Sequence, residues 1–465
     1  MVFSSLTFLC IFLPVVFVAH QLLPVMAAKN ALLIVASLVF YAYGEPSLIP
    51  LLLASTIVNY VLGLLVRRDD RPSKLWLVVA VVANLAFLGV FKYASMLVTT
   101  VNQIAGASIP VPQIALPLGI SFYTFQALSY VIDVYRGQVE PQRNYAHVLL
   151  YISFFPQLVA GPIVKYHDID AQIGSRNATS DEIALGLRRF CCGMGKKVLV
   201  SNVMGKVADS LFNHAAELSA PGAWVAALAY LMQIYYDFSG YSDMAIGLGH
   251  MFGFSFQENF DYPYVSTSIK EFWRRWHISL STWFKEYVYI PLGGNRKGRL
   301  RAGINKSIVF FLCGLWHGAA WTFVVWGLIH GAFSLMEEFV PIRKLPKALG
   351  HIYTIFVVTV AFVIFRADNF AQAGLMLRTM FCGWNVTQAS MVVLMERLTP
   401  LFAATFVAAC VLAMPVVPWL KGRFEASGNE TVVRGLSYAG SLVLLVLCVV
   451  SLSSGTYNPF IYFRF

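Results

Sequence analysis

The sequence has little charge: only 12% of its 465 residues are Asp, Glu, Lys or Arg, whereas 58% are hydrophobic. A soluble globular protein typically carries about 25% charged residues, so this chain has too little charge to cover a water-facing surface. Apolar runs near the ~20 residues that cross a bilayer recur along it. We therefore expect an all-α polytopic integral membrane protein.

Other absences narrow the chemistry. The seven cysteines form no C-x-x-C pair, which predicts neither a disulfide framework nor a zinc site, and we expect no metal and no bound cofactor. The sequence has no G-x-S-x-G nucleophile elbow, P-loop or H-E-x-x-H motif. It also lacks internal repeats, low-complexity tracts and flexible linkers. We expect one domain, residues 1–465, with bases available for catalysis but no obvious covalent nucleophile.

The spacing of apolar runs predicts about eleven transmembrane helices, with further tilted, re-entrant or interfacial ones. Run 30–43 is short for a full span, and run 304–334 is long enough for two elements. The runs are 6–26, 30–43, 47–66, 75–98, 113–134, 147–164, 190–212, 222–236, 239–256, 304–334, 351–366, 391–418 and 433–453.

The net charge of +11 is explained by membrane topology without a nucleic-acid partner. Basic residues gather in short clusters between apolar runs, as the positive-inside rule predicts for cytoplasmic loops. The cluster at Arg67 and Arg68 falls inside if the N-terminus lies outside. Run 6–26 lacks the basic start of a secretory signal, so we expect a retained membrane helix, with a cleaved signal peptide as the alternative.

Two histidines, His277 and His317, stand in apolar surroundings, where ionisable side chains are costly and usually functional. Gly314 and Gly318 give the helix of His317 a small-xxx-small pattern that admits a close neighbour, and Gly327 and Gly331 repeat it. An imidazole with a pKa near ~6.5 can remove a proton from a hydroxyl at neutral pH. A structural histidine bonded to a carbonyl is the alternative.

His277 lies in a segment, 257–301, that combines many aromatic and charged residues, a composition typical of helices in the membrane interface. On a continuous helix, Trp273 and Ser281 would share its face and could form a polar pocket with aromatic walls. Solvation of this histidine by headgroups is the alternative interpretation.

Carboxylates interrupt a third apolar stretch. Asp237 and Tyr241 share a helical face, and Asp243 follows two residues later. Intramembrane carboxylates are usually functional or paired. Pairing with Arg274, Arg275 or Lys197 is the alternative to a role in substrate binding.

These residues lie in stretches that resemble the membrane-bound O-acyltransferase superfamily, and within it the bacterial alginate O-acetyltransferase branch. The likeness runs over most of the chain and is strongest from about 115 to 335, the expected catalytic core. The stretches are MVFSS at 1–5, PLGISFY at 117–123, AGP at 160–162, YDFSGYSDMAIG at 236–247, EFWRRWHISLS at 271–281, LGGNRKG at 292–298 and LWHG at 315–318.

The resemblance implies a fold in which membrane helices surround a thinned central channel with funnels towards both faces. It implies that His317 is the catalytic histidine and His277 the second functional polar residue. It also implies a cytoplasmic acyl thioester donor such as acetyl-CoA and a hydroxyl acceptor. In this branch, acetyl groups pass to periplasmic SGNH-type acetyltransferases, which modify an exported polysaccharide such as alginate or cellulose, and the enzyme lies in the bacterial inner membrane.

We therefore expect His317 to act as general base, and His277 to orient the donor carbonyl, assist proton movement or bind the oxyanion. Basic residues at 196–197 and 296–297 are candidates to attract the donor's phosphates. The expected substrate-binding residues are Asp237, Tyr241, Asp243, Trp273, Arg274, Arg275, Trp276, Ser281 and Trp316.

Two rival functions are a D-alanyl transfer protein of teichoic acid synthesis, which shares the two histidines, and a polytopic transporter. The stretch 292–298 favours the polysaccharide branch over the first. Related halves or paired broken helices, which transporters often show, are absent from the sequence.

Overall fold

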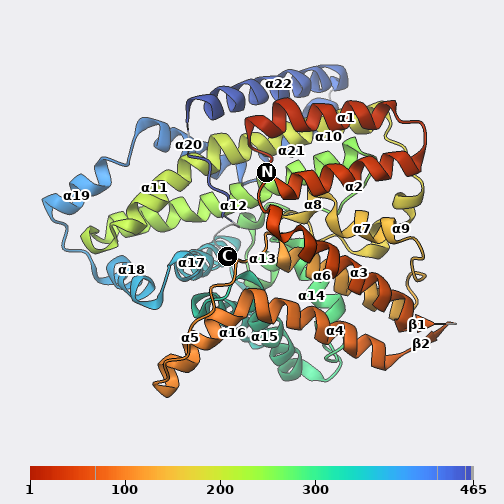
Figure 1. The fold of residues 1–465 in the computed structure, drawn as a ribbon. Coiled ribbons are helices and arrows are strands. Elements are labelled where there is room, and N and C mark those ends of the chain that lie inside the picture. The colour runs from red at the N-terminus through yellow and green to blue at the C-terminus, as the bar shows by residue number, and fades with distance from the viewer. Residues whose placement is uncertain (69, 427, 456, 462–465) are drawn as a thin grey trace. The chain divides into compact units, whose positions relative to one another are not determined.

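The computed structural model describes all residues except 69, 427, 456 and 462–465 (Figure 1). The described chain is mainly helical, with one short antiparallel hairpin of β1 (Arg67–Arg68) and β2 (Arg71–Pro72). It forms two compact units. Unit 1 comprises Met1–Phe190 and Ser242–Glu258, and unit 2 comprises Cys191–Tyr241 and Asn259–Phe465. The single-domain assignment stays a prediction.

Unit 1 is organised around α6 (Ile120–Arg136), most of whose side chains are buried. Helices α3 and α4 both pack against α6, and Gly63 of α3 lies directly against the ring of Tyr130. The other helices wholly within this unit are α1 (Leu13–Leu22), α2 (Met26–Ala42), α3 (Ile49–Val66), α4 (Lys74–Leu88), α5 (Ala94–Ala105), α7 (Tyr145–Ser153), α8 (Phe155–Leu158) and α9 (Tyr166–Gly174).

Unit 2 is built around a tight antiparallel pair, α15 (Gly298–His317) and α16 (Trp321–Phe339), which lie side by side in Figure 1. A Cβ on Gly314 would lie 2.5 Å from the carbonyl oxygen of Phe323, and one on Gly327 would lie 2.3 Å from that of Phe310. Glycine is therefore needed at both crossings, which confirms the close approach predicted from the small-xxx-small pattern.

Further helices lie wholly within unit 2. They are α11 (Asn202–Asn213), α13 (Ile269–Arg275), α14 (Ile278–Phe284), α17 (Lys347–Arg366), α18 (Phe370–Cys382), α19 (Gln388–Met395), α20 (Pro400–Leu412), α21 (Val416–Ala426) and α22 (Glu430–Ser454). Two other helices, α10 (Ser180–Gly195) and α12 (Ala220–Met251), each contain a boundary between the units.

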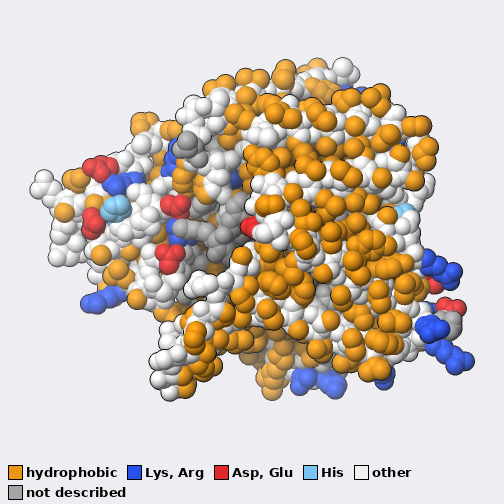
Figure 2. Space-filling model, viewed as in Figure 1, with side chains coloured by type: hydrophobic (Ala, Val, Ile, Leu, Met, Phe, Trp, Pro, Cys, Tyr) orange, Lys and Arg blue, Asp and Glu red, His pale blue; other side chains and the backbone are white. Residues whose placement is uncertain are grey.

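The surface carries the apolar side chains expected of a membrane protein. Figure 2 shows hydrophobic side chains over the face that includes α1 to α4. Exposed examples are Val15 and Val18 on α1 and Val78 and Val82 on α4. Exposed apolar area on this scale is typical of contact with lipid rather than water.

Four described helical segments are long and apolar enough to cross a membrane, and a bent pair, Gln388–Met395 with Pro400–Leu412, would add a fifth. The expected count of about eleven and the thinned channel stay predictions. Run 304–334 does form two helices, as its length suggested. The 257–301 segment does not form one interfacial helix, because α13 and α14 are separated by a break.

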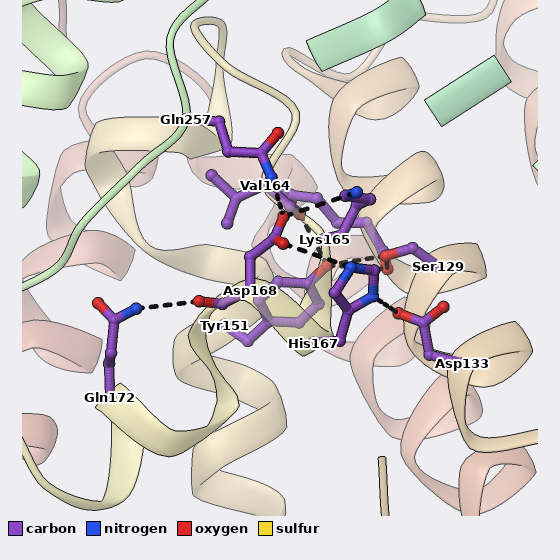
Figure 3. Close-up of polar contacts among 10 residues, drawn as sticks. Ser129, Asp133, Tyr151, Val164, Lys165, His167, Asp168, Gln172 and Gln257 are labelled. Atoms are coloured by element: carbon purple, nitrogen blue, oxygen red, sulfur yellow. Dashed lines mark hydrogen bonds and ion pairs between the residues drawn. The ribbon is translucent and has the colours of Figure 1, made fainter. Parts of the chain in front are cut away.

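A polar cluster in unit 1 joins α6 to α9, as Figure 3 shows. The Nδ1 atom of His167 lies 2.8 Å from the fully buried carboxylate of Asp133, and its Nε2 atom lies 3.3 Å from Asp168. The hydrogen bond to Asp133 raises the pKa of His167 above its ordinary value, against the opposing effect of partial burial. His167 thus has a structural role in joining the two helices.

The cluster predicts a pH-dependent stability. Because the folded pKa of His167 exceeds the unfolded value of about 6.5, its stabilisation is complete below about pH 6.5 and is lost as the pH rises through the folded pKa. The melting temperature of purified protein in detergent should therefore fall as the pH is raised from 6.5. His167→Gln should remove this component and the exposed-site control His351→Gln should retain it; an unchanged pH profile in His167→Gln would contradict the assignment.

Candidate active site

His277 lies at the break between α13 and α14, with φ 45° and ψ 56°. A non-glycine residue in this left-handed region is uncommon, and such conformations concentrate at functional sites. The break overturns the continuous helical face predicted for Trp273, His277 and Ser281. Instead, the Ser281 hydroxyl donates to the carbonyl oxygen of Trp273 at 3.2 Å and connects the two short helices.

Asn259 fixes the orientation of the His277 ring. Its Oδ1 atom accepts from the backbone N–H of Ser279 at 3.3 Å and lies 3.0 Å from His277 Nδ1. Because the backbone N–H can only donate, the amide oxygen must face this site, and His277 Nδ1 must carry the proton. In the neutral ring, Nε2 then holds the lone pair. That atom is buried and has no hydrogen-bond partner among the described residues.

His317 is the last residue of α15 and lies in a cage of rings that includes His277. Its ring centroid lies 5.1 Å from that of Trp326, 5.3 Å from that of Phe365 and 6.4 Å from that of His277. Trp316 contacts both imidazoles, at 5.0 and 5.7 Å. The fold thus brings together two histidines that lie forty positions apart in the sequence.

A small cavity of about 10 Å³ adjoins His317 and has room for roughly one water molecule. Its lining is aromatic and aliphatic, with the imidazole and the indole N–H groups of Trp276 and Trp326 as its polar groups. Charge that develops there is poorly solvated by water and interacts strongly with neighbouring polar groups. The lining residues are Ile234, Phe238, Trp276, His317, Trp326, Phe362 and Phe365. Among the described residues, no group of three or more His, Cys, Asp or Glu side chains could hold a metal ion.

A larger cavity of about 390 Å³, lined by Trp273, Arg274 and Ser281, lies in the same unit. Its floor is aromatic and aliphatic, and Lys270, Lys285 and Lys306 add to the positive charge of Arg274. Both Lys270 and Lys306 pair with the carboxylate of Glu338. This charge distribution suits an anionic group attached to an apolar or flexible chain.

The Lys pair also sets the protonation of Glu338. Partial burial would raise the pKa of this carboxyl, but the hydrogen bonds and charges of Lys306 and Lys270 lower it below its ordinary value. Glu338 is therefore ionised at neutral pH and holds both ammonium groups at the edge of the cavity.

Trp273 connects the larger cavity with the aromatic cage. Its ring lies 5.7 Å from that of Trp326, and its indole N–H donates to His330 Nδ1 at 3.2 Å. Trp276 lines the small cavity beside His317. Of the predicted tryptophans, Trp316 contacts both histidines and Trp276 lines the cavity beside His317, whereas Trp273 reaches the cage through Trp326.

Asp237 and Tyr241 make structural contacts with Lys197 and with the C-terminal segment. The Lys197 ammonium donates to Asp237 Oδ1, and the backbone N–H of Ile461 donates to Asp237 Oδ2 at 3.0 Å. The Tyr241 ring stacks on Phe460 at 4.6 Å. Asp237 therefore has one of the partners that the sequence allowed. Lys197 is buried in this pair and is unavailable to a donor phosphate, which corrects that expectation.

Asp243 belongs to unit 1, where Arg189 donates to it through Nε at 3.1 Å and also pairs with Glu258. Its partner is neither Arg274 nor Arg275, contrary to the alternatives weighed from the sequence. Arg275 instead bonds Asp261 at 2.9 Å. Asp237, Tyr241, Asp243 and Arg275 each have a structural partner in this arrangement. The substrate-binding roles assigned to them stay predictions.

Sequence reasoning missed the residues that complete the site. Asn259 had no distinguishing pattern beyond its place at the start of a polar, aromatic segment. Trp326 and Phe365 lie in apolar runs, where an aromatic residue is usually part of the core. Only the arrangement in space shows that they enclose His317.

Comparisons with known proteins agree with the stretches identified in the sequence. Residues 142–367 match the MBOAT, membrane-bound O-acyltransferase family. The chain is 40% identical to a probable alginate O-acetylase of Pseudomonas putida, with both chains covered completely. It is 38% identical to a peptidoglycan O-acetyltransferase of Helicobacter pylori over 82% of this chain and 80% of that one. A teichoic acid D-alanyltransferase of Bacillus subtilis is 26% identical over 54% of this chain and 69% of its own length.

The buried pair of Asp237 and Lys197 predicts a large stability cost when one partner is removed. Lys197→Met leaves a buried carboxylate without its counter-ion, so the free energy of unfolding should fall by about 3–5 kcal/mol. The double variant Lys197→Met, Asp237→Leu should recover much of this loss, and Lys297→Met, at an exposed lysine, should have little effect. Unfolding in mixed detergent micelles would measure this, and equal stability of Lys197→Met and wild type would refute the pairing.

Proposed function

Because the chain belongs to the membrane-bound O-acyltransferase family and is an O-acyltransferase, we propose that it moves acetyl groups for O-acetylation of an exported polysaccharide. The observation that carries the proposal is the pair of imidazoles, 6.4 Å apart, within the aromatic cage. Full-length similarity to an alginate O-acetylase supports alginate or a related polymer as the final product. Cellulose is a further candidate polymer.

In the proposed reaction, an acetyl thioester such as acetyl-CoA donates from the cytoplasm. The acceptor oxygen attacks the thioester carbonyl carbon while its proton passes to the imidazole of His317. The tetrahedral intermediate then collapses, the carbon–sulfur bond breaks, and the leaving thiolate takes a proton from the imidazolium. The oxygen ester and the free thiol are the products, and no redox change is involved.

The tautomer of His277 distinguishes among its expected roles. With Nδ1 protonated towards Asn259, the neutral ring presents an acceptor at Nε2 and cannot donate to an oxyanion there. This arrangement supports a role in proton movement over one in oxyanion binding. The aromatic cage supports the transfer by limiting the access of bulk water to the reacting carbonyl.

The larger cavity supplies a candidate site for the donor. Arg274 and Lys285 are exposed on its rim and could bind the phosphates of a CoA-like thioester. In this proposal the exposed basic residues at 296–297 add long-range attraction. Partners would be periplasmic SGNH-type acetyltransferases, and the location would be the bacterial inner membrane.

The D-alanyl transfer function is the second candidate. It rests on the lower, partial similarity to a teichoic acid D-alanyltransferase and on the shared two-histidine arrangement. The higher identity over the whole chain to the alginate relative favours acetyl transfer. Transfer of D-alanine in place of acetate by purified protein would reverse this preference.

The first catalytic prediction concerns His317. General-base catalysis contributes roughly 10²–10⁴ in rate, so His317→Ala should retain about 1% of the wild-type activity or less. Polymer acetylation would be measured in cells whose own gene is deleted, complemented with wild type, His317→Ala or the exposed control His351→Ala at matched membrane levels. His277→Ala should show a smaller or equal loss. Acetylation by His317→Ala at the level of the control would remove this residue from the mechanism.

The second catalytic prediction concerns the tautomer of His277. Asn259→Ala removes the acceptor that holds the proton on Nδ1, so the acetylation rate should fall, by less than the roughly 10²–10⁴ expected for loss of a base. Ser279→Ala keeps the Asn259–His277 hydrogen bond and is the matched control. Equal rates in the two variants, with equal thermal stability, would show that this hydrogen bond has no catalytic effect.

A further inference from the structure

A third cavity, of about 200 Å³, lies where α17 ends and shares a wall with the small cavity beside His317. Phe365 lines both cavities. Its ring lies 5.3 Å from the His317 ring on one side and 4.8 Å from the Phe323 ring on the other. Phe365 is thus common to the wall of this cavity and to the rings around the imidazole.

The cavity contains a buried arginine with an unused donor. Arg366 is only 4% exposed. One of its terminal nitrogens donates to Asp209 Oδ1 at 2.6 Å, and the other lies 3.8 Å from Asp368. Its Nε–H is buried and has no hydrogen-bond partner among the described residues. Because an unsatisfied buried donor is costly, its retention points to a partner that arrives with a ligand.

The guanidinium is held in a fixed position. It lies 5.0 Å from the centroid of the Phe212 ring and 5.9 Å from that of Tyr230, in addition to its bond to Asp209. Cation–π contacts and the ion pair restrict its motion, so the Nε–H is oriented before a ligand binds. Such preorganisation is what positions a reacting group efficiently.

The charge of this cavity selects the kind of ligand. Arg366 contributes one positive charge, and its two carboxylate partners, Asp209 and Asp368, contribute two negative charges. The three groups together are negative, which disfavours a carboxylate-bearing ligand and leaves an uncharged hydroxyl as the acceptor of the Nε–H bond. The aromatic walls formed by Tyr230, Phe323 and Phe365 suit the apolar part of the same molecule.

We propose that this cavity is the acceptor subsite, that it takes an uncharged alcohol, and that Arg366 is its positioning residue. The inference rests on the proposed function, and it adds that a polyuronate is not the direct acceptor. The Arg366 Nε–H donates to an oxygen of the acceptor. When the Phe365 ring turns aside, the acceptor hydroxyl reaches His317, gives up its proton there and attacks the thioester carbon as described above.

The test is ligand binding to the full chain in nanodiscs, measured by calorimetry, with three probes. Cellotriose represents a neutral sugar, trimannuronate a uronate of equal length, and N-acetylserinamide a neutral protein-type alcohol. Wild type should bind at least one neutral probe about tenfold or more tightly than the uronate. The neutral probe that binds identifies whether the alcohol comes from a sugar or a side chain.

Two variants and a control make the result specific. Arg366→Lys keeps the charge that pairs with Asp209 but removes the Nε–H, so binding of the neutral probe should weaken by about tenfold or more. Arg378→Lys, at an exposed arginine of α18, should bind as wild type does. Asp368→Asn removes one negative charge from an exposed side chain near Arg366. The difference in affinity between the neutral probe and trimannuronate should therefore become smaller.

The opposing results are also defined. Tightest binding of the uronate, no binding of any probe, or equal binding by wild type and Arg366→Lys would overturn the subsite. Acetyl transfer from acetyl-CoA is followed in parallel on the same samples. Binding that depends on Arg366 without any transfer would contradict the proposed function while leaving the subsite supported.

Discussion

The hydrogen bond between Asn259 Oδ1 and His277 Nδ1 is the contact on which the arrangement of the site depends. It holds a histidine in a left-handed turn, where the α13–α14 break turns the side chain out of any helical face. It also decides which ring nitrogen carries the proton, and so leaves Nε2 as an acceptor. The strain of the turn is a local cost that the surrounding contacts offset.

The position of His317 depends on a different constraint, the close crossing of α15 and α16. Gly314 and Gly327 let the two helices approach so closely that a Cβ at either position would clash with the backbone of the other helix. Helix α15 ends at His317, just after this crossing. Rings from α16 and α17 close around the imidazole. A rigid backbone crossing and a dense aromatic shell together restrict its rotation, as precise positioning of a catalytic group requires.

Much of this site could be predicted from local sequence. His277 and His317 interrupt apolar stretches, and the spacing of the glycines predicted a closely packed helix pair. The partners of these residues could not be predicted. Asn259 reaches His277 across a break that helical periodicity does not foresee, and Asp243 pairs with Arg189, a residue 54 positions away. Contacts between distant segments depend on tertiary packing, about which local periodicity carries no information.

The same limit applies to the membrane architecture. Composition and run length predicted a helical membrane protein, and the division of run 304–334 into two helices followed from its length. Run length could not show that α19 and α20 are bent by 72° at their junction, because hydropathy does not record the direction of a helix. Nor could it show that the 257–301 segment breaks at His277, where a tertiary hydrogen bond prevails over helical propensity.

The central claim is that acyl transfer takes place between His277 and His317, and a structure with a bound donor analogue tests it most directly. Acetonyl-CoA, in which a methylene inserted between the sulfur and the carbonyl carbon makes the thioester an unreactive ketone, would be bound to the protein in nanodiscs. Its position would be determined by electron cryomicroscopy. The account predicts the analogue's carbonyl carbon within the aromatic cage, leaving about 3–3.5 Å to an attacking oxygen beside His317. A well-ordered analogue whose carbonyl lies outside the cage would contradict it.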